Sequence, residues 1–148
     1  MRNKLMIVLA ALGGLFVLGL VLALRVWPFL NAVETGGTPA YPDLQPKTYQ
    51  VPVDRVFEVA RKVADRMPRW GRVTYRFGPH EIKAVARSAI FGFEDDVTIR
   101  MTPEGQGATV WVRSASRVGK WDFGQNARTI QTFLAALDQQ LEGEAGQS

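Results

Sequence analysis

The chain has no cysteine and only one histidine, and these two shortages remove several kinds of chemistry. Without cysteine there is no disulfide, no thiolate metal site and no cysteine nucleophile. The single histidine, His80, stands in a Gly-Pro-His turn, where a metal site would need carboxylates as its other ligands and a serine triad would have no alternative base. We therefore interpret His80 as an exposed turn residue and predict no catalytic residues, no metal and no cofactor.

The chain also lacks nucleotide-binding glycine loops, a zinc-protease histidine pair and a strong excess of one charge. The net charge is +4, but Arg2, Lys4 and Arg25 flank a hydrophobic segment. From Tyr41 onward, 15 Lys and Arg residues stand against 13 Asp and Glu residues. Proteins that bind nucleic acid concentrate basic residues far more heavily, so we predict no nucleic-acid partner.

One long apolar run dominates the N-terminal part of the sequence. Met6–Leu24 contains 19 residues without a charge, which as a helix would span about 28 Å, close to the hydrocarbon thickness of a bilayer. A buried core helix would show a polar stripe, and a signal peptide would have a shorter apolar region before a small-x-small cleavage site. We therefore predict an uncleaved membrane anchor, followed at the interface by Trp27, Pro28 and Phe29.

The charges around this run predict its orientation. Arg2, Lys4 and the terminal amine precede it, whereas Arg25 is the only basic residue after it until Lys47. The positive-inside rule then favours a cytoplasmic N-terminus. We predict a single-pass protein of a bacterial inner membrane, with its domain in the periplasm.

The remaining sequence divides into three segments after the anchor and its flanks, residues 1–30. Residues 31–46 are rich in glycine and proline and are predicted to form a linker that holds the domain off the membrane. Residues 47–141 carry the periodic patterns of a folded domain, and residues 142–148 are predicted to be a disordered tail.

Within the domain, the apolar pattern changes from helical to alternating and back. Apolar residues at helical spacing from Val56 to Met67 predict a helix, which Asp54 caps and Pro68 ends. Alternation then predicts strands over 72–77, 82–87, 96–101 and 109–113, and Thr48–Val53 is a further short edge strand. Helical spacing returns from Ile130 to Leu141. We predict an α+β fold: an N-terminal transmembrane helix, then a small antiparallel sheet of three to five strands with two helices packed on one face.

This packing places a set of basic side chains on the opposite face of the sheet. The face is either solvated, with acids such as Asp96 neutralising the arginines across strands, or a surface for anionic lipid or an acidic partner. The predicted basic surface comprises Arg72, Arg76, Lys83, Arg87, Arg100 and Arg113.

Two segments, Ile90–Arg100 and Arg113–Arg128, contain more special residues than folding requires. Asp122 and Asn126 are suited to capping a helix and the turn before it. Arg117 and Arg128 can pair with the carboxylates of Asp95, Asp96 or Asp122. The adjacent acids Glu94, Asp95 and Asp96 would point to alternating sides of a strand. The polarity expected of a hairpin explains this acidic cluster as well as a role in binding a divalent cation would. The candidate polar cluster, functional or structural, comprises Asp95, Asp96, Arg117, Asp122, Asn126 and Arg128.

These two segments resemble the signature stretches of a family known as domain of unknown function 1499. The first is Phe91-Gly92-Phe93 followed by Asp95-Asp96, and the second is Ser116-Arg117-Val118-Gly119 followed by Asp122, Gly124 and Asn126. At its end the chain departs slightly, because Arg128 falls one place early and Thr129 precedes Ile130. The resemblance covers about Tyr41 to Leu141 and implies no catalytic role.

The leading hypothesis is a membrane-anchored, non-enzymatic binding or accessory domain at the cell envelope. Its partner would be a membrane-protein complex or an anionic lipid, and the loop aromatics Phe91, Phe93, Trp121 and Phe123 either contact that partner or fill the mouth of the core. One alternative is an enzyme with Asp95, Asp96, Arg117 and Asn126 in a cleft. The other is a carrier of a small apolar ligand between sheet and helices. Convergence of the polar residues on an open pocket would favour the enzyme, and an enclosed apolar cavity would favour the carrier.

Overall fold

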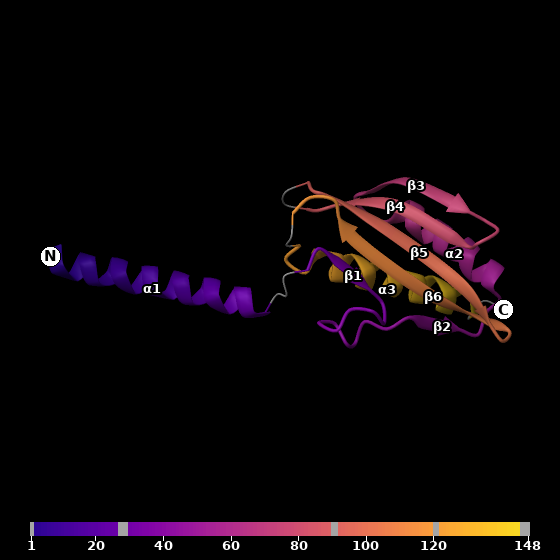
Figure 1. The fold of residues 1–148 in the computed structure, drawn as a ribbon, viewed down its shortest axis with the longest axis horizontal. Coiled ribbons are helices and arrows are strands. Elements are labelled where there is room, and N and C mark those ends of the chain that lie inside the picture. The colour runs from indigo at the N-terminus through magenta and orange to yellow at the C-terminus, as the bar shows by residue number, and fades with distance from the viewer. Residues whose placement is uncertain (1, 27–29, 90–91, 120–121, 146–148) are drawn as a thin grey trace.

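The computed structural model describes residues 2–26, 30–89, 92–119 and 122–145 (Figure 1). A long N-terminal helix precedes an α+β domain, which confirms the predicted α+β class. The elements in chain order are α1 (Arg2–Val26), β1 (Ala32–Glu34), β2 (Lys47–Tyr49), α2 (Val53–Arg66), β3 (Trp70–Arg76), β4 (Glu81–Arg87), β5 (Glu94–Glu104), β6 (Gly107–Ser116) and α3 (Gln125–Ala145).

The strands form one antiparallel sheet of six strands, more than the three to five predicted. β3, β4, β5 and β6 follow one another as a meander, and both β1 and β2 pair with β6. Ala32 pairs with Ala115 in one ladder, and Lys47 pairs with Val110 in the other. The sheet therefore closes the domain by joining its first residues to its last strand.

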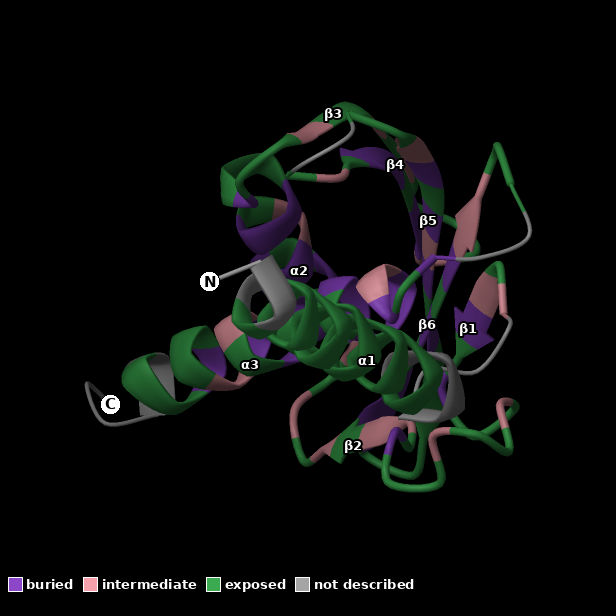
Figure 2. Cartoon of the chain, turned by 90° about the vertical axis from the view of Figure 1, so that its left-hand side faces the viewer, coloured by how far each residue is buried: buried purple, intermediate pink, exposed green. Residues whose placement is uncertain are grey.

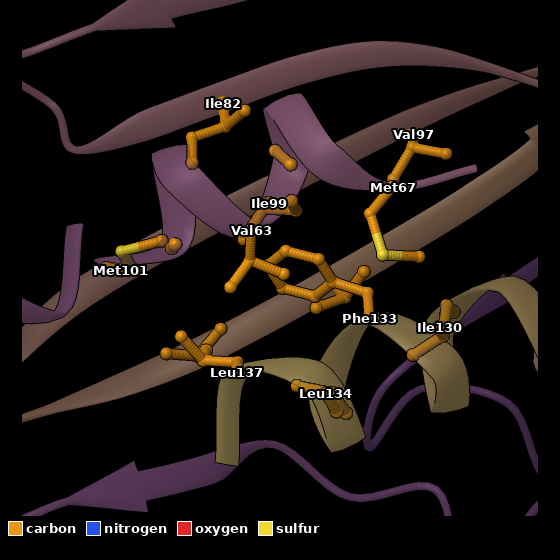
Figure 3. Close-up of a cluster of buried hydrophobic side chains, with 14 of the residues drawn as sticks. Val63, Met67, Ile82, Val97, Ile99, Met101, Ile130, Phe133, Leu134 and Leu137 are labelled. Atoms are coloured by element: carbon orange, nitrogen blue, oxygen red, sulfur yellow. The ribbon is translucent and has the colours of Figure 1, made fainter. Parts of the chain in front are cut away.

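Helices α2 and α3 lie together behind the sheet in Figure 1 and bury its apolar side. The alternating residues Ile82, Val97 and Ile99 point toward the helices and are almost fully buried, as the sequence pattern predicts. Phe133 of α3 lies at the centre of this core (Figure 3). Its ring stacks on that of Trp70, with the ring centroids 5.6 Å apart. Burial of these side chains is the main stabilising contribution to the fold.

The described side chains of helix α1 are not part of this core. Its apolar side chains from Met6 to Leu22 are exposed, in contrast to the buried stripes of α2 and α3 (Figure 2). Among the described residues, none of the three helices combines the length and the hydropathy expected of a membrane span. This finding does not support the predicted transmembrane anchor, which stays a proposal. The interfacial residues Trp27, Pro28 and Phe29 lie outside the described residues.

Two of the predicted segment boundaries differ from the structure. Residues 31–46 do not form a free linker, because β1 lies within them and Val33 and Leu44 are buried in the core. The predicted disordered tail, 142–148, begins inside α3, which continues to Ala145 after the buried Leu141. In the 31–46 segment, contacts to distant parts of the chain such as β6 stabilise residues whose local sequence is a weak predictor of structure.

Two local predictions around the first domain helix were also wrong. The cap of α2 is Pro52, without a side-chain hydrogen bond, and β2 ends at Tyr49, short of the predicted Val53. Asp54 instead lies 2.7 Å from Nε2 of His80, whose side chain is mostly buried against the Phe57 ring. His80 is therefore a packed turn residue and is not exposed as predicted.

Candidate functional site

The predicted polar cluster divides between the two faces of the sheet. Asp95 and Asp96 are consecutive in β5, so their side chains point in opposite directions. Asp95 is 2% exposed on the helix side, whereas the Asp96 side chain is 54% exposed on the outer side. Arg117 joins Asp96 on the outer side, and Asn126 is fully buried on the inner side. The four residues of the enzyme hypothesis therefore do not converge on one cleft.

On the inner side, Asn126 is the centre of a buried hydrogen-bond network. Its Oδ1 accepts a 2.6 Å hydrogen bond from Ser114, and its Nδ2 donates to Oγ of Ser116 and to the carbonyl of Asn31. The network joins β6, the first turn of α3 and the residue just before β1. Because the amide has partners on both sides, it fixes these three segments relative to one another.

Asp95 extends this network but is not fully satisfied. Its register partner in β6 is Ser116, which hydrogen-bonds its carboxylate, yet Oδ2 has no partner among the described residues. Burial raises the pKa of Asp95; the Ser116 hydrogen bond opposes that rise, and the charges of Asp122 and Asp96 add to it. An under-coordinated buried carboxyl group in a signature motif requires an explanation beyond packing.

Asp122 performs the capping role predicted for it. Its Oδ1 accepts from the backbone N–H of Gly124, and its Oδ2 accepts from that of Asn126, each at 2.9 Å. These bonds satisfy donors at the start of α3 and place a negative charge near the positive end of the helix dipole. Arg128 donates to the carbonyl of Phe123 at 3.0 Å and so closes the same turn. This turn is rigid because its side chains bind its own backbone.

The outer face carries the predicted basic surface in two groups, each built around one glutamate. Glu81 is buried beneath the basic side chains, and Nε of Arg100 donates to it at 2.9 Å. Glu94 receives Arg117 at 2.5 Å and Arg87 at 3.0 Å. The remaining ion pairs of these groups are Arg76 and Lys83 with Glu81, and Arg72 with Glu94.

Acidic residues thus neutralise part of the basic surface, as the solvated-face interpretation predicts. Hydrogen bonds from Arg100 and Arg76, with the charge of Lys83, lower the pKa of Glu81 against the opposing effect of burial. Arg113 lies opposite Thr98 and Glu34 in the same surface without an ion pair among the described residues. Three cations surround each glutamate, so a positive excess remains on this face.

A groove lies at one end of the domain, with a volume of about 650 Å³. It lies between the end of α2, the end of β4 and the first turns of α3. Its floor is formed by the core residues Met67, Trp70 and Ala86. This volume is in the range of small-molecule sites, and the floor is apolar as such sites usually are.

The rim of the groove is basic and its backbone is strained. Arg69, between α2 and β3, and Arg128, in α3, both line the groove, and neither forms an ion pair with a carboxylate of the described residues. Arg69 and Phe123 both have left-handed backbone angles, with φ of 62° and 51°. Such conformations cost about 1–3 kcal/mol each in residues other than glycine, and they concentrate at ligand-binding positions.

Two of the predicted loop aromatics reach the described surface near this end. Phe123 lines the groove and is 46% exposed, and Phe93 is 51% exposed. Each of these two side chains is thus about half exposed and half buried. Phe91 and Trp121 lie outside the described residues.

The chain from α1 enters the domain at this same end (Figure 1). The backbone N–H of Asp122 donates to the carbonyl of Leu30, and the N–H of Ser116 donates to that of Asn31 at 2.7 Å. Only residues 27–29 separate Val26 of α1 from Leu30. Four peptide units span at most about 15 Å, so the end of α1 lies within that distance of Leu30. Leu30 in turn contacts the turn at residues 122–124 just before α3, which we call the motif turn.

Comparison with protein families gives a match over residues 27–137 to a family described as "Protein of unknown function (DUF1499)". The match covers most of the chain. The chain belongs to the DUF1499 family. The resemblance drawn from the two motifs is therefore confirmed. The motif residues lie at the same end of the domain as the groove, some on the inner side of the sheet and some on the outer side.

Other comparisons add little to the DUF1499 assignment. No curated protein matches the chain. A crystal structure of CalU16 from Micromonospora echinospora matches with a TM-score of 0.40 and 16% identity over 69% of this chain and 76% of that one. The crystal structure of TTHA0849 from Thermus thermophilus matches with a TM-score of 0.38 and 14% identity over 76% of this chain and 98% of that one.

Sequence reasoning found the DUF1499 motif residues but missed the groove. The local sequence around Arg69 and Trp70 does not indicate a site, because Pro68 alone explains the end of the helix before them. The only local signal is the density of Arg and aromatic residues between Arg66 and Arg76. The groove forms only when this segment meets the end of β4 and the start of α3.

Proposed function

We propose that this DUF1499 protein is a membrane-anchored, non-enzymatic binding domain at the cell envelope. Met6–Leu24 would hold it in a bacterial inner membrane as a single pass, with the N-terminus in the cytoplasm and the domain in the periplasm. The sequence of the whole run supports this, together with the exposure of its apolar side chains in α1.

The observation that carries the proposal is the attachment of Leu30 and Asn31 to the motif turn. Since residues 31–46 are not a free linker, an anchored domain would have little reach from the bilayer. The groove and Phe123 would then face the lipid surface at close range. A binding function at the membrane follows more directly from this arrangement than a reaction does.

The partner in this proposal is a membrane-protein complex or an anionic lipid. The positive excess of the outer sheet face and of the groove rim favours an anionic surface in either case. An enzyme using Asp95, Asp96, Arg117 and Asn126 is not favoured, because these residues lie on different faces of the sheet.

The anchor is tested by alkaline carbonate extraction of membranes from a bacterium that expresses the full chain. We expect the protein to stay in the pellet and a Leu12→Asp/Leu18→Arg variant to be released, because charges in the bilayer centre cost several kcal/mol. Protease added to intact spheroplasts should digest the domain if it is periplasmic. Release of the unaltered chain by carbonate would contradict the proposal.

The accessory-subunit form of the proposal is tested by gentle detergent extraction, affinity capture and mass spectrometry. A protein subunit recovered in stoichiometric amount would support it. Recovery of the chain alone in every detergent would favour lipid as the partner.

A further inference from the structure

We infer that the groove between the ends of α2 and β4 and the start of α3 binds an anionic amphiphile. The apolar chain of this ligand would lie on the floor formed by Met67 and Trp70, and its acidic head would lie between Arg69 and Arg128. The inference rests on the proposed function for the source of the ligand. The binding chemistry itself rests on the groove.

The apolar part of the argument is the continuity of the groove with the hydrophobic core. Met67 and Ala86 are buried, and Trp70 stacks on Phe133, so the floor is rigid. A hydrocarbon chain placed there would remove further apolar surface from water at about 25 cal/mol per Å². Thr129 and Thr132 form one wall from α3 and offer little that repels such a chain.

The charge part of the argument is that two guanidinium groups flank an apolar space without carboxylates of their own. Arg128 uses Nη2 on the Phe123 carbonyl and keeps its other N–H groups for a ligand. Arg87, also at the rim, is paired with Glu94 at 3.0 Å. Among the described residues that line the groove, only Asp122 is acidic, and its two oxygens accept from the backbone N–H groups of Gly124 and Asn126. The rim is thus complementary to a carboxylate or phosphate head.

Two sources can supply this chemistry, a free fatty acid and an anionic phospholipid of the bilayer. The end of α1 lies within about 15 Å of Leu30, which is hydrogen-bonded to the motif turn, so a bilayer lipid would be within reach of an anchored domain. Both sources share the acidic head and the apolar chain that the groove recognises, and the experiment separates them.

The experiment measures quenching of tryptophan fluorescence in the full chain reconstituted in phosphatidylcholine vesicles. Dibrominated stearate is added in one arm, and vesicles containing dibrominated phosphatidylglycerol are used in the other. We expect saturable quenching that is lost from a Trp70→Phe variant in at least one arm, and that arm identifies the source. Dibrominated stearyl alcohol, which partitions into bilayers but carries no charge, should require about tenfold higher concentration, as expected for the loss of a charge-assisted hydrogen bond.

The variants separate head-group recognition from a general charge effect. Arg69→Gln and Arg128→Gln should each weaken binding of the acid about tenfold and leave the alcohol unchanged. Arg113→Gln removes the same charge on the outer face and should have no effect. Thr132→Phe, at an exposed position of α3 on the groove wall, should block the acid and the alcohol together.

The inference is overturned if the acid and the alcohol quench equally, or if Trp70→Phe retains the saturable quenching in both arms. Equal behaviour of the Arg69→Gln, Arg128→Gln and Arg113→Gln variants would overturn it as well. If carbonate releases the protein but free stearate still quenches Trp70, the anchor proposal fails and the groove inference stands.

Discussion

Individual residues of the DUF1499 motifs act mainly as internal connectors. Asn126 joins β6, α3 and the entry of the chain at Asn31, and Asp122 holds the first turn of α3. The side chains that looked most like a catalytic group in the sequence are therefore occupied with one another and with backbone. Asp95 is the exception, since one of its oxygens has no partner among the described residues.

Replacement of Asn126 by alanine should destabilise the domain by about 2–3 kcal/mol. The change removes three hydrogen bonds and leaves the buried hydroxyl of Ser114 without its acceptor, whereas the Asn31 carbonyl keeps its bond from the Ser116 N–H. Urea unfolding followed by circular dichroism measures the loss. Gln131→Ala, at an exposed position of the same helix, should change stability by less than about 0.5 kcal/mol. Equal effects of the two variants would contradict the assigned role.

Asp95→Asn should make the stability of the domain less dependent on pH. The folded state raises the pKa of Asp95 above its ordinary value of 3.8, so it holds the proton more tightly than the unfolded state does. The stability of the unaltered protein therefore falls as the pH rises from the ordinary value through the raised one. At pH 7 the variant should be more stable by about 1–3 kcal/mol, and below the ordinary pKa this advantage should disappear. A pH-independent difference in unfolding midpoint would refute this account.

At the scale of elements, the periodic segments were predictable and the short ones were not. The helix near Val56–Met67 and the strands around Ile82 and Val97 follow from apolar spacing, because each buries one continuous face. The three-residue strand β1 has too little local pattern to be recognised. It forms because Ala32–Glu34 pairs with Arg113–Ala115, which lie far later in the chain. The pairing register of β1 with β6 therefore cannot be predicted from the local sequence.

The candidate site shows the same division. Asp122 was predicted as a cap because its distance from Asn126 is a local property, and the Arg117–Asp96 pair was anticipated from charge. The groove could not be predicted, since its walls come from three separate segments and its floor from the core.

The contact between β2 and β6 leaves no room for a side chain at Gly107. A Cβ there would lie 2.2 Å from the carbonyl oxygen of Tyr49. Gly107→Ala should therefore push β2 away and destabilise the domain by about 1–3 kcal/mol. Hydrogen exchange of the β2 amides should accelerate, although Tyr49 still has its hydrogen bond to Asp138 of α3. Gly71→Ala is the matched control, because nothing lies within 4 Å of the added atom; a comparable loss there would contradict the explanation.

At the scale of the whole molecule, the important distance is the short one between α1 and the domain. Insertion of ten Gly and Ser residues between Val26 and Leu30 should leave the thermal unfolding of the domain unchanged, since the insertion lies outside its hydrogen bonds. It should reduce the quenching of Trp70 by brominated phosphatidylglycerol, because a flexible linker lowers the local concentration of bilayer lipid at the groove. Quenching by free stearate should not change. A parallel drop with free stearate would show that the insertion damages the groove itself.

The pairing of β1 with β6 also constrains the order in which the protein can fold during its synthesis. β1 is the first strand made, and its partner, the other end of the Asn126 network and α3 all come from the last third of the chain. Contacts of such wide sequence separation form late, after a large loss of chain entropy. The helix α1 is therefore made while the domain behind it is still unfolded, and the domain can close only after β6 and α3 have been synthesised.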